Sequence, residues 1–322
     1  MSSISLLAIS NPALPELSRL EELQGPVDLI VSNDLEYLTE RAPDADVILN
    51  CTFHGDLFCK VFPHASKVRW VHSLSAGVET ILCPELAAGA TPLTNGRGVF
   101  RGSLAEFTIT AILYFAKELR RMIRQQQAGV WKQFDVVEIK GRTLGVVGYG
   151  EIGRASAELA KALGMRVIAL RRRASLSQAD PLLDAVYPAD QLRDLMAASD
   201  YVLAAAPITP DTRGMIGAAE LRAMKPTAAI INVGRGPVID EAALIDALRE
   251  KRIAGAALDV FDVEPLPPGH PFFELENVLL SPHCADHTPG WVGLAMTQFL
   301  EEFERFRTGQ PLRNIVDKQA GY

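Results

Sequence analysis

The stretch TLGVVGYGEIGRASAELAKALGMRVIALRRR, residues 143–173, contains the pattern G-x-G-x-x-G at residues 148–153. A short apolar run precedes the pattern and a helical segment follows it, which predicts a strand, a tight turn and a helix. Gly148 allows the turn, Gly150 lets the backbone approach a pyrophosphate, and Gly153 lets the helix pack on the strand. The helix N-terminus offers free N–H groups and a positive dipole end to the phosphates.

The residues after this helix indicate which dinucleotide binds. The glycine pattern alone is weak evidence, but a second apolar strand at 167–170 lies at the expected distance and strengthens it. Arg171, Arg172 and Arg173 follow that strand. An acid usually stands there to bind the ribose 2′-hydroxyl of NAD, whereas arginine suits a 2′-phosphate. The sequence therefore predicts NADP as the preferred cofactor, with NAD possible and a solvated basic helix start as the alternative interpretation of the arginines.

Composition limits the function classes. The chain has 322 residues, enough for two domains with cores, and 48% of them are hydrophobic. Its formal net charge of −7 argues against nucleic acid or an anionic membrane as the main partner. The four cysteines show no spacing typical of zinc sites, so we expect no metal and a reduced, cytoplasmic setting. Since the N-terminal apolar run is short and lacks a basic start, we expect it to form a strand and not a signal peptide.

Short apolar segments alternate with helical segments along the chain, which predicts an α/β fold with parallel sheets. We expect strands near residues 5–9, 27–31, 47–50, 68–72, 146, 167, 185–187, 201–205, 228–233, 254–259 and 278–281. The helix at 290–307 and its tail need a partner in the first half of the chain. The prediction is two Rossmann-like, doubly wound domains. The dinucleotide-binding domain, residues 103–285, is inserted into a discontinuous substrate-binding domain, residues 1–102 and 286–322.

Between the two predicted domains, residues 94–103 are rich in glycine and polar side chains and are typical of a linker. A long helix is expected from 103 to 127, with Ser103 and Glu106 as a capping box. Its apolar residues extend around much of the helix surface, which favours a contact with a second subunit.

Three further strand ends carry reactive side chains. They are Arg235 in NVGRG (232–236), Glu264 in ALDVFDVEP (257–265) and His283 in SPHCA (281–285). Taken singly, each has an ordinary structural interpretation: a surface ion pair, a solvated turn or a satisfied core histidine. Together they fit the reduction of a 2-keto acid. Histidine donates the proton, glutamate raises the histidine pKa, arginine binds the carboxylate, and a nicotinamide supplies the hydride.

These segments resemble the D-isomer-specific 2-hydroxyacid dehydrogenases over nearly the whole chain. The resemblance extends to SLSAGVE at 73–79, GVW at 129–131 and PLRNIVD at 311–317. It implies the catalytic residues Arg235, Glu264 and His283. It implies cofactor contacts from Gly148, Gly150, Glu151, Ile152, Gly153, Arg171, Arg172, Arg173, Pro207, Val233 and Asp259, the last near the nicotinamide. The backbone of Ala76, Gly77 and Val78 is expected to cradle the substrate carboxylate with Arg235, since consecutive N–H groups in a turn form an anion nest.

Some residues depart from the family pattern. The usual acid after the second strand is Arg171 here, and Glu264 stands where formate-oxidising members carry Gln. Asp286 and His287 follow Ala285, where members often have Gly; Asp286 is either a helix N-terminal residue or a group that tunes the site.

The sequence as a whole predicts an NADPH-preferring, homodimeric reductase of small 2-keto acids, of the glyoxylate or hydroxypyruvate type. One alternative is an NAD-linked dehydrogenase of a bulkier D-2-hydroxy acid. The other is a dinucleotide-sensing, co-repressor-like binding protein.

Overall fold

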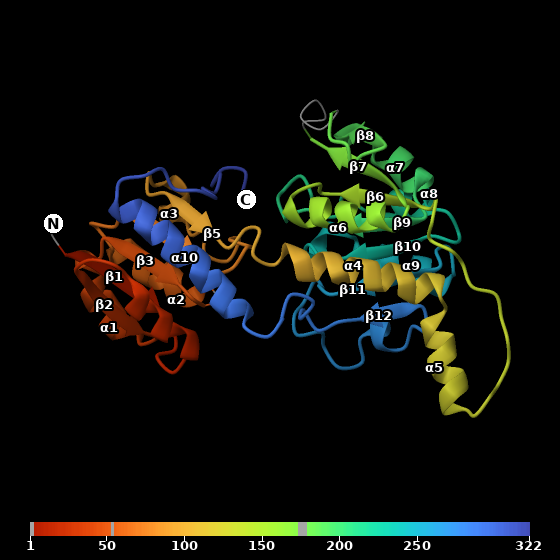
Figure 1. The fold of residues 1–322 in the computed structure, drawn as a ribbon, viewed down its shortest axis with the longest axis horizontal. Coiled ribbons are helices and arrows are strands. Elements are labelled where there is room, and N and C mark those ends of the chain that lie inside the picture. Colours follow the sequence, from red (N-terminus) through yellow and green to blue (C-terminus); the bar gives the residue numbers. More distant parts are fainter. Residues whose placement is uncertain (1–2, 53–54, 173–178) are drawn as a thin grey trace. The chain divides into compact units, whose positions relative to one another are not determined.

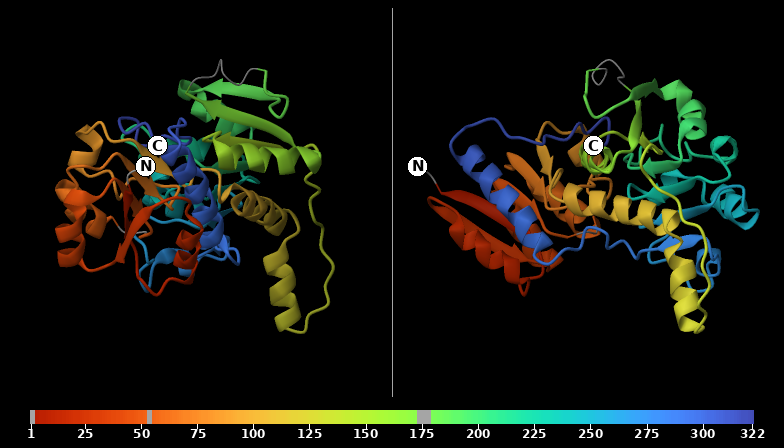
Figure 2. Two further views of the ribbon diagram at one scale, coloured as in Figure 1. Left: turned by 60° about the vertical axis from the view of Figure 1, so that its left-hand side comes forward. Right: turned by 45° about the vertical axis from the view of Figure 1, so that its right-hand side comes forward.

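The computed structural model describes residues 3–52, 55–172 and 179–322, and the chain divides into two compact units (Figures 1 and 2). Unit 1 consists of Met1–Phe100 and Thr288–Tyr322. Unit 2 consists of Arg101–His287. Each unit is built on its own parallel sheet, which confirms the predicted α/β fold class.

The sheet of unit 1 has the strand order β2-β1-β3-β4-β5. Its strands are β1 (Ile4–Ile9), β2 (Val27–Ser32), β3 (Val47–Asn50), β4 (Trp70–Ser73) and β5 (Leu93–Asn95). Its helices are α1 (Leu35–Arg41), α2 (Asp56–Val61), α3 (Pro84–Ala88) and α10 (Trp291–Arg307), with the short 3-10 helices η1 (Pro15–Glu22), η2 (Ala42–Asp44) and η3 (Phe62–His64). Every residue of β3 and β4 is buried, as expected for parallel strands covered on both faces.

The C-terminal segment completes the core of unit 1. Phe299 of α10 stacks on Trp70 of β4, with ring centroids 5.6 Å apart. After α10, the Val316 N–H donates to the Leu93 carbonyl at 2.8 Å, so the tail pairs with β5. His72 of β4 lies fully buried beside Phe299, and burial lowers its pKa to about 3. His72 is therefore a neutral core residue, and the last residues of the chain belong to the first unit.

Unit 2 contains a doubly wound sheet with the strand order β12-β11-β10-β9-β6-β7-β8. The strands are β6 (Thr143–Val147), β7 (Arg166–Arg171), β8 (Ala185–Pro188), β9 (Tyr201–Ala204), β10 (Ala229–Asn232), β11 (Gly255–Leu258) and β12 (Val278–Leu280). The order of connections reverses between β6 and β9. Ligands of such sheets bind outside the carboxyl ends of the strands at this switch point.

Helices cover both faces of this sheet. The helices of unit 2 are α4 (Arg101–Ala116), α5 (Leu119–Gln127), α6 (Glu151–Ala162), α7 (Leu192–Ala198), α8 (Ala218–Ala223) and α9 (Glu241–Arg249), with the 3-10 helices η5 (Ala189–Gln191), η6 (Gly236–Val238) and η7 (Pro271–Phe273); of these, α5 extends away from the sheet (Figure 1). Helices α4 and α6 pack against each other on one face (Figure 1). Alternate strand residues on the other face, such as Ile168, Val202 and Ile230, form a core with α7, α8 and α9.

Three local predictions were wrong. The expected helix at 103–127 is two helices, because Glu118 adopts a left-handed backbone (φ 53°) between α4 and α5. No capping box forms at Ser103, since α4 begins at Arg101 and the Ser103 hydroxyl donates instead to the Ala285 carbonyl at 2.5 Å. Part of the expected linker at 94–103 is strand β5, which the C-terminal tail stabilises.

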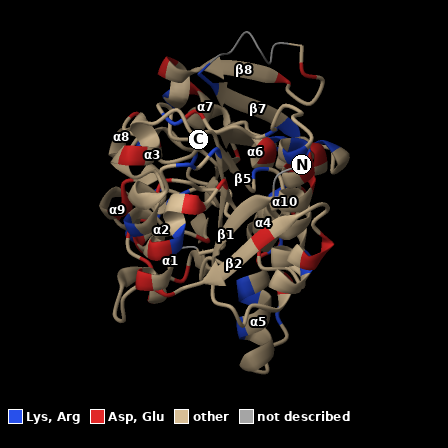
Figure 3. Ribbon diagram, turned by 90° about the vertical axis from the view of Figure 1, so that its left-hand side faces the viewer, with Lys and Arg blue, Asp and Glu red and all other residues tan. Residues whose placement is uncertain are grey.

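The apolar residues of α4 fall into two groups. Leu104, Ala111 and Ile112 are buried within unit 2, where α4 packs on α6, whereas Phe107 and Phe115 are only partly buried, so the predicted contact of this helix with a second subunit stays a prediction. In the view of Figure 3, acidic and basic residues are interspersed along the helices. Within the part of the chain that the structure describes, no helix combines the length and apolar character that a membrane crossing requires.

Candidate active site

Unit 2 brings the three predicted catalytic residues to one edge of its sheet. Arg235 follows β10, Glu264 lies in the loop after β11, and His283 follows β12. Strands β10, β11 and β12 are hydrogen-bonded neighbours and run parallel, so their carboxyl ends lie side by side. Three short apolar strands therefore assemble a cation, a carboxylate and an imidazole from segments far apart in sequence.

His283 and Glu264 form the central contact of this edge. The Nδ1 of His283 lies 2.6 Å from the Oε2 of Glu264, and the other oxygen of Glu264 accepts from the Phe261 N–H at 2.8 Å. The hydrogen bond to Glu264 raises the pKa of His283 and outweighs the opposing effect of burial. Burial raises the pKa of Glu264, but the hydrogen bonds from His283 and Phe261 bring it below its ordinary value. The pair thus favours an imidazolium next to a carboxylate.

Asp259 fixes the turn that presents His283. One oxygen of this buried carboxylate accepts from the Ser281 hydroxyl at 2.5 Å, the Cys284 N–H at 3.0 Å and the Ala285 N–H at 3.1 Å. His283 itself has a left-handed backbone with φ of 50°, which a non-glycine residue adopts only when its surroundings impose it. Asp259 therefore stabilises a strained turn. Its expected contact with the nicotinamide stays a prediction.

The Asn232 side chain shapes the turn that carries Arg235. Asn232 accepts from the Gly234 N–H and donates to the Arg235 carbonyl, both at 3.1 Å. The Arg235 guanidinium donates to the Gly234 carbonyl at 2.7 Å and is half-buried. A guanidinium has five N–H donors in a planar fork, which suits a substrate carboxylate.

The glycine turn lies at the switch point of the sheet. Gly148 has φ of 97°, and a Cβ there would lie 2.4 Å from the Ala206 nitrogen after β9. A Cβ on Gly153 would lie 2.6 Å from the Gly148 oxygen, whereas a Cβ on Gly150 would have no protein atom within 4 Å. Close packing within the protein thus requires glycine at positions 148 and 153. At Gly150 no protein atom fills the space, which is open to a ligand.

Helix α6 starts at this turn, and its first N–H groups have no hydrogen-bond partner among the residues that the structure describes. The first bond within the helix runs from the Arg154 N–H to the Gly150 carbonyl at 2.9 Å. The N–H groups of Glu151, Ile152 and Gly153 precede that bond and point out of the helix end, where they suit the phosphates of a dinucleotide. The Glu151 carboxylate is paired with Arg101 at 3.0 Å. Pro207 and Val233 follow β9 and β10 at the same edge of the sheet.

The arginines after β7 lie beside the glycine turn. Arg171 is half-buried, donates to the Tyr149 carbonyl and lies over the Tyr149 ring, 5.5 Å from its centroid. The Tyr149 hydroxyl donates to Asp180 at 3.0 Å. Arg172 is exposed, and Arg173 lies outside the described residues. At the predicted adenosine end of the site, the guanidinium of Arg171 is therefore oriented by Tyr149, and that of Arg172 is exposed.

The turn after β4 in unit 1 contains the predicted carboxylate nest. Asn95 donates to the Ala76 carbonyl at 2.5 Å, and the Val78 carbonyl accepts from Ile81 at 3.0 Å, which holds the turn from both ends. Within the described ranges, the backbone N–H groups of Ala76, Gly77 and Val78 have no hydrogen-bond partner in the protein. Adjacent unpaired N–H groups fit an anion.

Several supporting residues were not found from the sequence. Asn95, Asn232 and Ser281 hold the turns that carry the predicted site residues, but they act through side-chain hydrogen bonds that leave no spacing pattern in the sequence. Each follows or ends a short strand, which is the only signal that could have indicated it. No cluster of three or more potential metal ligands occurs among the residues that the structure describes.

Comparison with known proteins identifies the class. Residues 109–285 match the family model "D-isomer specific 2-hydroxyacid dehydrogenase, NAD binding domain". The glyoxylate reductase of Aeropyrum pernix is 34% identical over 294 residues, which is 88% of this chain and 87% of that protein. The chain therefore belongs to the D-isomer-specific 2-hydroxyacid dehydrogenases and is an NAD(P)-dependent oxidoreductase.

Two solved structures are similar over the whole chain. A D-isomer-specific 2-hydroxyacid dehydrogenase of Xanthobacter autotrophicus Py2, solved with NADPH and MES, is 29% identical with a TM-score of 0.83 and full coverage of both chains. An NADPH-dependent glyoxylate/hydroxypyruvate reductase of Sinorhizobium meliloti, solved with NADP and sulfate, is 26% identical with a TM-score of 0.83 and the same coverage. A nicotinamide dinucleotide is accordingly the cofactor class.

The glycine turn gives a matched pair of substitutions. Gly153→Ala forces a Cβ against the Gly148 carbonyl, so we expect the free energy of unfolding to fall by about 1–3 kcal/mol. Gly150→Ala adds a methyl group to open space, so we expect unchanged stability without cofactor but weaker dinucleotide binding. Chemical denaturation and calorimetric titration measure the two effects. A stable Gly153→Ala, or a Gly150→Ala that binds the dinucleotide as wild type does, would contradict this assignment.

Proposed function

We propose that this protein is an NADPH-preferring reductase of small 2-keto acids, of the glyoxylate or hydroxypyruvate type, with His283 as the proton donor. The observation that carries the proposal is the 2.6 Å contact between His283 and Glu264, at the sheet edge that also presents Arg235. The similarity to a glyoxylate reductase and to an NADPH-dependent glyoxylate/hydroxypyruvate reductase supports it.

In the proposed reduction, His283 donates its proton to the carbonyl oxygen of the substrate. Its Nδ1 is engaged by Glu264, so the other ring nitrogen, Nε2, carries the proton that is transferred. Glu264 stabilises the imidazolium before transfer and fixes the orientation of the ring. The bound nicotinamide supplies the hydride. In the reverse direction, neutral His283 accepts the proton of the hydroxy acid.

In the proposed reaction, Arg235 binds the substrate carboxylate. A guanidinium binds a carboxylate through two parallel N–H donors and fixes its plane as well as its position. In unit 1, the N–H groups of Ala76, Gly77 and Val78 are by themselves uncharged donors that suit an anion. Small 2-keto acids offer a carboxylate and a carbonyl on adjacent carbons, which suits an anion site combined with a proton donor.

The cofactor preference rests on Arg171 and Arg172. Arg171 donates to the Tyr149 carbonyl and lies over the Tyr149 ring, and these contacts orient its guanidinium at the end of β7. A fixed guanidinium favours a 2′-phosphate over a 2′-hydroxyl.

A substrate panel with both cofactors tests this function. We expect the purified protein to oxidise NADPH faster than NADH with glyoxylate or hydroxypyruvate. Arg171→Ala should raise KM for NADPH about tenfold or more, because a charge-assisted hydrogen bond is lost, and should change KM for NADH little. Arg193→Ala, an exposed arginine elsewhere in unit 2, serves as the control. Equal or faster use of NADH would refute the cofactor assignment, and no turnover of any 2-keto acid would refute the reaction.

The pH profile tests His283. Because Glu264 raises the pKa of His283, reduction should stay fast below that raised value and decline as pH rises through it; oxidation of the hydroxy acid should show the opposite trend. Glu264→Gln should move the decline to lower pH. His283→Gln should lower kcat about 10²-fold or more with cofactor binding retained. A profile that stays flat into the alkaline range would count against His283 as the acid.

The homodimer is proposed from an exposed apolar segment of unit 2, which we call the arm and define as residues 119–138. The arm extends away from the sheet of unit 2 in all three ribbon views (Figures 1 and 2). Trp131 is 97% exposed, and Ile123 and Val130 are each 49% exposed. Arg121 lies over the Phe134 ring at 4.1 Å and so links the two halves of the arm. A second copy of the chain would remove this surface from water.

Sedimentation velocity measures the assembly. We expect the wild-type protein to sediment at twice the chain mass at micromolar concentration. Trp131→Ser should weaken the association, because a large apolar contact is lost. Leu163→Ser, at an exposed apolar residue of unit 2 outside the arm, should leave it unchanged. A monomeric wild type, or a Trp131→Ser variant that dimerises normally, would refute the arm as the interface.

A further inference from the structure

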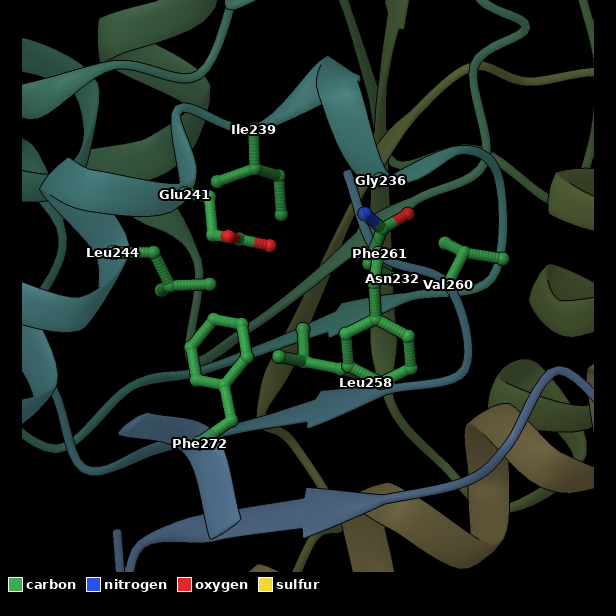
Figure 4. A pocket seen from close by; sticks show the side chains of 9 residues that line it. All are labelled: Asn232, Gly236, Ile239, Glu241, Leu244, Leu258, Val260, Phe261 and Phe272. Atoms are coloured by element: carbon green, nitrogen blue, oxygen red, sulfur yellow. The ribbon is translucent and has the colours of Figure 1, made fainter. Parts of the chain in front are cut away.

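A small cavity of about 10 Å³ lies in unit 2 next to Val260 and Phe261, which follow β11 (Figure 4). It is lined by Asn232, Gly236, Ile239, Glu241, Leu244, Leu258, Val260, Phe261 and Phe272. Glu241 is the acidic member of this lining, and its carboxylate reaches in from the first residue of α9 (Figure 4). A carboxylate in a largely apolar lining requires hydrogen-bond donors.

The two oxygens of Glu241 contact the two ends of one loop. The Oε2 of Glu241 accepts from the Asp262 N–H at 3.4 Å, and its Oε1 lies 3.1 Å from the Nε2 of His270. Residues 262–270 are the loop between these contacts, and Glu264 lies within it. One side chain of α9 therefore joins both ends of the loop that presents the partner of the catalytic histidine.

The hydrogen bonds of His270 define its proton position. Its Nδ1 accepts from the Phe272 N–H at 3.3 Å, so the ring proton is on Nε2 and is donated to Glu241. The His270 ring also packs against the Phe272 ring at 4.9 Å, and Phe272 packs against Phe261 at 6.2 Å. His270 thus donates to Glu241 from Nε2, and its ring is held in place by packing against Phe272.

The opposite side of the loop rests on the Arg235 turn. A Cβ on Gly236 would lie 2.0 Å from the Phe261 carbonyl carbon and 2.6 Å from the Asp262 nitrogen. The backbone from Phe261 to Asp262 is therefore in direct contact with the residue that follows Arg235. The Phe261 N–H is also the group that donates to Glu264. Movement of the loop would disturb both Glu264 and the Arg235 turn.

A carboxylate suits this position better than an amide. Both loop contacts come from N–H donors, and only an ionised carboxylate accepts at both of its ends. Glu241 lies near two other acids, Asp262 and Asp240. Burial and the charges of Glu241 and Asp240 raise the pKa of Asp262, whereas Arg213 and His270 lower it. The two hydrogen bonds therefore hold the loop against a local repulsion.

We propose that Glu241 is a positioning residue of the active site: together with His270 it clamps the loop 262–270 and thereby keeps Glu264 in contact with His283. This inference rests on the proposed function, because it assigns Glu241 a part in the reaction only through Glu264. Glu241 itself touches neither His283 nor, in the proposed mechanism, the substrate.

The kinetic test uses full-length variants. Glu241→Ala should lower kcat about tenfold or more, with the Kd for the dinucleotide changed less than about twofold, because Glu264 is no longer held. His270→Phe keeps the packing on Phe272 but removes the donor, and should show the same loss. His270→Gln restores a donor near the Nε2 position and should recover most of kcat. Glu250→Ala, at the other end of α9 and exposed, is the control and should match wild type.

Two further measurements separate positioning from general stability. In a double-mutant cycle, Glu241→Ala should add little to Glu264→Gln, since both act through the same contact. Titration of the His283 ring by NMR should show a lower pKa in Glu241→Ala and His270→Phe than in wild type. His283 is also faced by Asp259, Arg235 and Asp286, which these variants leave in place.

The outcomes distinguish this inference from the proposed function. Folded Glu241→Ala and His270→Phe proteins with wild-type kcat and an unchanged His283 pKa would overturn it, and so would fully additive losses in the cycle. If Glu241→Ala does not fold, His270→Phe decides the question. If the wild-type protein reduces no 2-keto acid, the proposed function fails, but the NMR titration still shows whether Glu241 holds Glu264 against His283.

Discussion

The proposed chemistry depends on one contact, the 2.6 Å approach of the Glu264 carboxylate to the His283 imidazole. Both side chains are partly exposed, at 33% for Glu264 and 45% for His283. Exposed ion pairs contribute little free energy, because side-chain entropy and solvent screening offset the attraction. The pair therefore does not hold itself together. Its geometry has to come from the backbone segments on which the two residues lie.

Each partner is fixed by a buried or half-buried acid at the end of a neighbouring element. Asp259 gathers three donors of the turn 281–285 and stabilises the left-handed backbone of His283. Glu241 accepts from both ends of the loop that contains Glu264. Asp259 directly follows β11 and Glu241 is the first residue of α9, and each acid acts on a segment about 20–30 residues away in the sequence. The carboxylates of Asp259 and Glu241 thus accept hydrogen bonds from the turn and the loop that carry the catalytic pair, and these bonds stabilise the strained backbone.

The sequence predicted those features that depend on local sterics and on strand ends. Gly148 and Gly153 were identified by spacing because each satisfies a short-range requirement, a positive φ or a close helix–strand approach. Arg235, Glu264 and His283 were identified because each follows an apolar strand. The supporting side chains could not be predicted, since Asn95 and Glu241 act on positions about 20–30 residues away through contacts that leave no periodic pattern. The break at Glu118 was missed for a related reason: a single left-handed residue ends α4 without glycine or proline.

The cofactor preference is harder to predict from the sequence than the reaction. Reaction chemistry needs His283 and Glu264 in contact, and the fold supplies that contact within one unit. Cofactor preference depends on a guanidinium whose donors are shared between the protein and a ligand. Arg171 already donates to the Tyr149 carbonyl, and Tyr149 in turn donates to Asp180. A 2′-phosphate would thus bind to an arginine whose position is set by the glycine turn itself, which ties phosphate recognition to the integrity of the G-x-G-x-x-G segment.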